Sequence, residues 1–335
     1  MHSSSRHFST ETIRHSGLEF RVTRFEGEQS VRKSNKPILV LLHGFLGSSK
    51  QFSHLIPELS KVCRPVTVDI RPVSTEQTRP SELTEPSDPP KYSDAPHRLD
   101  TPQSLDTAAR FDADSLVAGL RETLGRIRDG SGAPLALLGY SMGGRLALSL
   151  ATRHPGSVDG LVLESTTAGI EAPEQRNERR ASDRRKADLI RQDFGKFLEE
   201  WDRNPLFNPE QSVEPQTHPP RGEKPVPGDR IHPIDRLQRI QRRQDPEIIA
   251  KWLEEFGTGV MPPVWEHLGR IRVPVLIITG ASDPKFCDLA DRVKARLADA
   301  RHVVIRGAAH RVHLDRPTDY VAALNDFLSK HFTSG

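Results

Sequence analysis

Hydrophobic residues fall into short runs without alternation, and these runs are separated by helical patterns. Six runs have the length and sharp boundaries of buried strands: 38–42, 65–70, 135–138, 161–164, 273–279 and 302–306. Apolar residues recur at helical spacing in four segments between them, 111–127, 145–153, 287–297 and 320–327. Strands that lack alternation are typical of parallel sheets covered on both faces. The pattern predicts an α/β fold with a mainly parallel sheet, extended at one edge by a strand or two around residues 18–25.

The alternation of strand and helix stops between Glu164 and Val273. The segment is strongly charged, with a run of basic side chains from Arg176 to Arg191, and apolar residues then recur at helical spacing from Ile190 to Trp201. We therefore predict a helical cap over about residues 165–264. The core of the domain is then formed by residues 17–164 and 265–332.

Proline is concentrated in two places. Of the 27 prolines, seven lie in residues 72–102 and seven in residues 209–233. These stretches mix Pro with Ser, Thr, Glu and Asp without any period, which predicts extended or disordered inserts. The rest of the 335-residue chain has the length of one large α/β domain.

Composition excludes several classes of protein. No apolar run approaches the roughly 20 residues that span a bilayer, and residues 1–7 lack the apolar region of a signal peptide. Cys63 and Cys287 are too few for a disulfide framework and have no metal-ligand spacing. The net charge of +3 does not indicate a nucleic-acid partner. We expect a cytoplasmic protein without a membrane span, metal or cofactor, and the oligomeric state stays open.

The strongest local motif is Gly139-Tyr140-Ser141-Met142-Gly143, which lies between a predicted buried strand and a predicted helix. This is the GxSxG pattern of a sharp strand-to-helix turn that exposes its serine at the edge of the sheet. The motif therefore predicts that Ser141 is catalytic.

A catalytic serine needs a base and an acid that orients the base. Asp283 follows the strand predicted at 273–279, and His310 follows the last predicted strand, in the chain order Ser, Asp, His. Ligands bind at these strand ends in open α/β sheets. Glu164 is an alternative acid and His313 an alternative base, and we prefer Asp283 and His310 by position.

His43-Gly44-Phe45 follows the first strong strand. A loop in this place donates one backbone N–H to an oxyanion hole, and the residue after the nucleophile donates the other. We expect the backbone amides of Phe45 and Met142 in these roles.

Several further motifs carry a family resemblance: Leu42 to Ser48, Gly139 to Ala147, Glu164-Ser165 leading to Gly169-Ile170, Glu178 to Arg184, Trp201 with Pro205-Leu206-Phe207, and Asp283 to Phe286. Apart from the two inserts, the chain resembles the α/β-hydrolase superfamily. Within it, these residues are similar to the 2-succinyl-6-hydroxy-2,4-cyclohexadiene-1-carboxylate synthases of menaquinone biosynthesis. The Tyr-Ser-Met-Gly-Gly-Arg run and the arginine-rich cap segment are more specific than GxSxG alone.

The resemblance implies a lyase that eliminates pyruvate from 2-succinyl-5-enolpyruvyl-6-hydroxy-3-cyclohexene-1-carboxylate. This small-molecule substrate is a polycarboxylate with three carboxylates, and planar guanidinium groups suit such anions. Arg145 and Arg179 match the family's carboxylate-binding arginines. Tyr140 and Trp201 match pocket positions, and Lys285 lies beside the predicted acid.

The sequence departs from the family pattern in the cap. Gln241 stands where a third arginine is expected, with Arg239, Arg242 and Arg243 as candidate substitutes. The triad also allows an alternative function, a serine hydrolase of carboxylic esters in which Ser141 is the nucleophile.

Overall fold

The sheet at the centre of the molecule is mainly parallel, as the sequence predicts. The computed structural model describes residues 7–26, 36–73, 112–128, 130, 132–207 and 232–332. Within them the strand order is β1-β2-β4-β3-β5-β6-β7-β8, and only the β1–β2 and β2–β4 pairs are antiparallel. The strands are β1 (His7–His15), β2 (Leu18–Glu26), β3 (Ile38–Leu42), β4 (Arg64–Pro72), β5 (Leu135–Tyr140), β6 (Gly160–Glu164), β7 (Val275–Gly280) and β8 (Ala300–Ile305).

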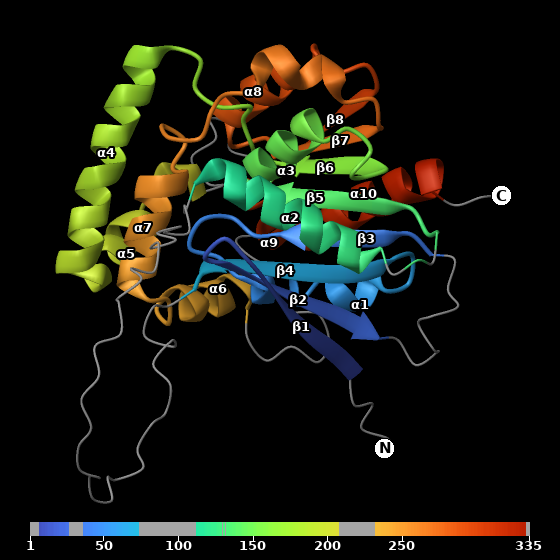
Figure 1. Ribbon diagram of the computed structural model, residues 1–335, viewed down its shortest axis with the longest axis horizontal. Helices are drawn as coiled ribbons and strands as arrows, with labels where there is room; N and C mark the ends of the chain where they lie inside the picture. The colour runs from blue at the N-terminus through green and yellow to red at the C-terminus, as the bar shows by residue number, and fades with distance from the viewer. Residues whose placement is uncertain are drawn as a thin grey trace, which may run out of the picture.

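Helices cover both faces of this sheet (Figure 1). Alternate residues of each strand face opposite sides, so Val40 packs with helices α2 and α3 while Leu39 packs with α1 and α10. Both faces are apolar, which explains the runs without alternation. The helices of the core are α1 (Ile56–Leu59), α2 (Ala113–Ile127), α3 (Met142–Arg153), α8 (Pro284–Lys294), α9 (Val312–Asp315) and α10 (Pro317–Phe332).

The edge of the sheet begins earlier than the predicted core boundary at residue 17. Strands β1 and β2 form a hairpin whose turn residues, Ser16 and Gly17, both have positive φ, 45° and 75°. Two consecutive residues with positive φ match the right-handed twist of a two-residue hairpin. The Ser-Gly pair is therefore the local signal that indicates β1.

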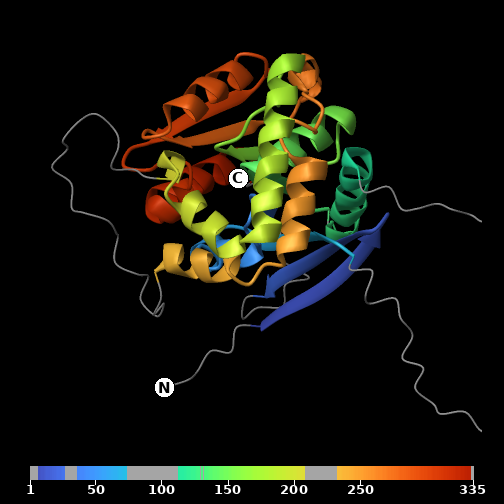
Figure 2. The same ribbon diagram turned by 90° about the vertical axis from the view of Figure 1, so that its left-hand side faces the viewer.

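The cap lies between β6 and β7 and gathers at one side of the sheet (Figures 1 and 2). The predicted continuous helix through Ile190 and Trp201 is instead two helices, because Asp193 has φ −154° and its side chain accepts the amide N–H of Lys196. Asp193 thus ends one helix and caps the next. The cap helices are α4 (Pro173–Gln192), α5 (Phe194–Asp202), α6 (Pro233–Gln241) and α7 (Pro246–Phe256).

The cap has its own apolar cluster. Ile190, Phe197 and Leu253 are buried against one another and against Leu46 of the core. Leu46 follows Phe45, so the cap packs directly on the loop that the sequence assigns to the oxyanion hole. The two predicted inserts lie outside the described residues, except at their ends. No described helix is long and apolar enough to cross a membrane.

Candidate active site

The GxSxG segment forms a tight turn from β5 into α3. Ser141 has φ +51°, and its amide donates a 2.8 Å hydrogen bond to the carbonyl oxygen of Glu164. A Cβ on Gly139 would lie 2.4 Å from the carbonyl oxygen of Gly143, and one on Gly143 would lie 2.6 Å from that of Leu42. Because both contacts are with backbone, neither glycine has room for a side chain. The turn therefore depends on these glycines, and it leaves Ser141 facing the cavity described below.

Ser141, His310 and Asp283 come together at the carboxyl ends of β5, β8 and β7. Nε2 of His310 lies 3.1 Å from Oγ of Ser141, and Nδ1 lies 2.8 Å from Oδ2 of Asp283. Asp283 and His310 are only 2 % and 3 % exposed. A carboxylate at Nδ1 favours the tautomer that keeps a proton there, so that Nε2 can accept the serine proton.

The alternative acid and base form a separate pair. Nδ1 of His313 lies 2.7 Å from Oε1 of Glu164, and the Tyr320 hydroxyl donates to Oε2 of Glu164 at 2.9 Å. Both members of the pair are fully buried. Among the described residues, neither side chain bonds to Ser141 or to the ring of His310, so the geometry favours Asp283 and His310.

The two amides expected in the oxyanion hole are available for a ligand. Phe45 and Met142 line the same cavity as Ser141. Within the described part of the chain, neither amide donates a hydrogen bond to a protein acceptor. The arrangement can therefore stabilise negative charge that develops on an oxygen near Ser141.

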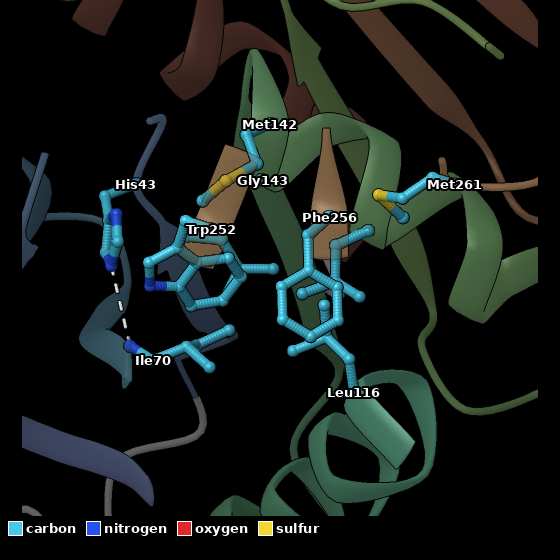
Figure 3. A pocket seen from close by; sticks show the side chains of 10 residues that line it. His43, Ile70, Leu116, Met142, Gly143, Trp252, Phe256 and Met261 are labelled. Carbon is cyan, nitrogen blue, oxygen red and sulfur yellow. Dashed lines mark hydrogen bonds between the residues drawn. The ribbon is translucent and has the colours of Figure 1, made fainter. Parts of the chain in front are cut away.

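His43 holds the loop that carries Phe45 in place. Nδ1 of His43 lies 2.8 Å from the carbonyl oxygen of Gly44, and the amide of Ile70 donates to Nε2 at 3.5 Å. Figure 3 shows His43, Met142 and Trp252 around the small apolar pocket beside this loop. A packed, apolar wall on this side restricts movement of both amides.

A cavity of about 640 Å³ opens over Ser141 and His310. Its size is that of a small-molecule site. Trp201 packs edge-on against Phe45, with ring centroids 5.3 Å apart, so the cap closes over the oxyanion loop. All five residues predicted from the sequence to bind substrate line the cavity: Tyr140, Arg145, Arg179, Trp201 and Lys285.

Cationic side chains gather at the α4 wall of this cavity. Burial, together with the positive charge of Arg179, lowers the pKa of Arg145 to about 10, although Asp183 opposes the shift. Arg145 is nevertheless cationic at neutral pH. Nε of Arg179 donates to both carboxylate oxygens of Asp183, at 2.8 and 2.9 Å. Lys186 lies 3.9 Å from the same carboxylate, and burial lowers its pKa.

The substitutes expected for a third arginine are not in the cavity. Arg239, Arg242 and Arg243 are exposed and do not line it, because α6 turns Leu237 and Gln241 inward instead. Three other cations, Lys186, Arg292 and Arg311, do line it and were not predicted as site residues. For Arg311 a signal exists in the sequence, since it directly follows the predicted catalytic histidine.

A metal site is absent from the described residues, which contain no group of three or more His, Cys, Asp or Glu side chains that could hold an ion.

Comparisons with known proteins agree with this fold. A protein of Bacillus subtilis (strain 168), provisionally named a 2-succinyl-6-hydroxy-2,4-cyclohexadiene-1-carboxylate synthase, is 34 % identical over 194 residues. This match spans 58 % of the chain and 65 % of the relative, less than two thirds of its length.

Solved structures show the same fold. MenH from S. aureus has a TM-score of 0.69 at 24 % identity, over 96 % of this chain and 100 % of that one. An esterase from Exiguobacterium antarcticum has a TM-score of 0.63 at 17 % identity, over 95 % and 98 %. The family model described as the alpha/beta hydrolase fold matches residues 37–317. The chain therefore belongs to the α/β-hydrolase fold family.

Proposed function

We propose that this protein is a lyase of menaquinone biosynthesis, which eliminates pyruvate from 2-succinyl-5-enolpyruvyl-6-hydroxy-3-cyclohexene-1-carboxylate. The observation that carries the proposal is the cationic wall of Arg145, Arg179 and Lys186 in the cavity that contains Ser141. A substrate with three carboxylates needs such a wall, whereas a neutral ester does not. The likeness to the Bacillus subtilis protein supports the same substrate.

The triad supplies a base in this reaction. Asp283 orients His310, and His310 accepts the proton of Ser141. The serine oxygen then takes the proton from the ring carbon that carries the succinyl group, next to its ketone. The ketone oxygen gains negative charge, and the amides of Phe45 and Met142 donate hydrogen bonds to it.

The electrons of the broken C–H bond complete the elimination. They form a new ring double bond, the existing ring double bond moves by one position, and the C–O bond to the enolpyruvyl group breaks with its electron pair on oxygen. The released enolpyruvate takes up a proton and becomes pyruvate. No bond forms between Ser141 and the substrate, so no acyl-enzyme arises.

One set of observations favours a second candidate, a serine hydrolase of carboxylic esters. Acyl transfer requires a serine that faces a cavity, a buried histidine–acid pair and two available amides, and Ser141, His310–Asp283 and the amides of Phe45 and Met142 supply them. In that reaction Ser141 would attack a carbonyl carbon rather than a proton.

The two candidates differ in their products. The test follows pyruvate release from the enolpyruvyl substrate with a lactate dehydrogenase coupled assay, beside hydrolysis of p-nitrophenyl butyrate. We expect pyruvate with little ester turnover. Rapid ester hydrolysis without pyruvate would establish the hydrolase instead.

A further inference from the structure

Arg311 is a buried cation beside the catalytic histidine. It directly follows His310, lines the cavity and is only 7 % exposed. Its guanidinium carbon lies 3.7 Å from the centroid of the Phe207 ring, and Phe207 in turn packs edge-on against His310. Stacking on an aromatic face orients a guanidinium, and its N–H groups stay available for hydrogen bonds in the plane of the guanidinium itself.

Among the described residues, Arg311 has no carboxylate at hydrogen-bond distance, although Asp315 and the Tyr140 hydroxyl also interact with it. Its nearest carboxylate is Asp202, with Nη2 and Oδ1 3.7 Å apart, which is longer than a hydrogen bond. Within the described ranges, Oδ1 of Asp202 is buried without a hydrogen-bond partner, and Oδ2 accepts from Gln238 at 3.2 Å. A buried guanidinium without a bidentate acid is unfavourable. An anion that enters from the cavity would complete its hydrogen bonds.

Two separate groups of cations line the cavity, apart from Lys285 and from Arg292, which is paired with Glu171. Arg145 and Arg179 influence each other and share Asp183 under α4. Arg311 instead contacts Phe207 and Asp202, at the end of α5, and faces the Tyr140 hydroxyl. Ser141 lines the cavity together with both groups.

The carboxylates of the proposed substrate also form two groups, a neighbouring pair and one that lies apart. The succinyl group and the ring carboxylate are on neighbouring ring carbons, and the enolpyruvyl group is attached across the ring from the succinyl carbon. Once the succinyl-bearing carbon is placed at Ser141, two carboxylates remain near that carbon and one lies at a distance. The paired arginines match the neighbouring carboxylates.

We propose that Arg311 binds the carboxylate of the enolpyruvyl group and so selects the leaving group of the reaction. This inference rests on the proposed function. By holding the carboxylate of enolpyruvate as the C–O bond breaks, Arg311 also favours departure of this group. The product, which lacks the enolpyruvyl group, has nothing for Arg311 to bind.

The product therefore gives the sharpest test. Arg311→Met should raise KM for the substrate by about 10- to 100-fold, the value of a charge-assisted contact. Competitive inhibition by the product should keep its wild-type constant, which also shows that the variant is folded. Arg311→Lys should give a KM between those of wild type and Arg311→Met, because lysine keeps the charge and lacks the planar fork. Arg306 is an exposed arginine in the same segment. The control Arg306→Met should leave both KM for the substrate and the inhibition constant of the product unchanged.

Binding without turnover separates this inference from the proposed function. In a Ser141→Ala background, calorimetry with the intact substrate should show the same loss of affinity when Arg311→Met is added. If wild type releases no pyruvate but this loss is seen, the subsite stands and the lyase function fails. If pyruvate is released and Arg311→Met leaves substrate affinity unchanged, or weakens the product equally, the subsite is overturned and the lyase function stands.

Discussion

Glu164 joins Ser141 to the segment that carries His310. Its backbone carbonyl oxygen accepts the amide N–H of Ser141 at 2.8 Å. Its Oε1 lies 3.1 Å from the backbone nitrogen of His313 and 2.7 Å from Nδ1 of that residue. Because His313 is three residues after His310, Glu164 holds both sides of the Ser141–His310 contact: its backbone carbonyl holds Ser141, and its buried carboxylate holds the segment of His310.

Removal of this carboxylate should destabilise the fold. Glu164→Ala leaves His313 and Tyr320 buried without their partner, and we expect the free energy of unfolding to fall by about 3 to 5 kcal/mol. Glu164→Gln keeps the size and an acceptor oxygen, so its effect should be smaller. Denaturant unfolding measures both. Glu199→Ala, at an exposed ion pair with Arg203, should change stability by less than about 1 kcal/mol. Equal effects at Glu164 and Glu199 would contradict this role.

Ser141→Ala should reduce the rate of pyruvate release while it preserves binding. General base catalysis contributes about 10²- to 10⁴-fold, and the lost hydroxyl removes that contribution. The arginines that hold the carboxylates are unchanged, so calorimetry with the reaction product, which neither protein converts, should give the same dissociation constant for Ser141→Ala and wild type. Equal turnover by wild type and Ser141→Ala would falsify the role of Ser141.

Much of the geometry of the candidate site could be predicted because each part is encoded locally. The glycines around Ser141 are required by backbone contacts at 2.4 and 2.6 Å, and Asp283 and His310 follow strands with sharp hydrophobic boundaries. A parallel sheet brings such strand ends to one edge whatever the loops contain. Sequence order alone therefore placed these residues near one another.

The cap could be predicted only in outline. The helical periodicity from Ile190 to Trp201 continues through Asp193, where an N-cap divides it into two helices. In a helix as basic as α4, the sequence also does not show which cations face the cavity, because that depends on how α4 packs on α7. Lys186 was missed for this reason. Arg311 was missed because its inward position depends on Phe207, which comes from the cap.

Gly139→Ala should destabilise the protein and lower its activity. The added Cβ would lie 2.4 Å from a backbone oxygen of Gly143, so the turn that presents Ser141 must shift. We expect a loss of about 1 to 3 kcal/mol, as for other overpacked positions. Gly125→Ala is the matched control, because its Cβ meets nothing within 4 Å in α2. This helical substitution should stabilise the protein by up to about 1 kcal/mol. Denaturant unfolding gives the free energy of unfolding of both variants. A Gly139→Ala protein as stable as wild type would contradict the steric argument.

Arg145→Ala should distinguish a polycarboxylate site from an ester site. The arginine lies within the cavity, and its Nη2 donates to the carbonyl oxygen of Phe256 at 3.2 Å. Loss of a charge-assisted contact should raise KM for the enolpyruvyl substrate by about 10- to 100-fold. Any hydrolysis of p-nitrophenyl butyrate, a neutral ester, should change much less. Arg185→Ala, exposed on α4, serves as the control and should leave both activities unchanged. A parallel loss of both activities would point to a structural role for Arg145.

Asp315 should make stability depend on pH. Burial raises the pKa of Asp315 from its usual 3.8 to about 6, and the hydrogen bond from the amide of Ala309 opposes the shift. Since the folded state holds the proton more tightly, the contribution of Asp315 to stability is greatest below pH 3.8 and is lost as the pH rises through about 6.

Asp315→Asn removes this dependence because the amide resembles the protonated acid and still offers an oxygen to Ala309. The variant should therefore gain stability relative to wild type as the pH rises across this range, by between about 1 and 3 kcal/mol. Urea unfolding of both proteins at a series of pH values measures the difference. If the difference in free energy of unfolding between the two proteins stays constant across the range, Asp315 titrates as it does in the unfolded chain. Burial would then not destabilise its charged form.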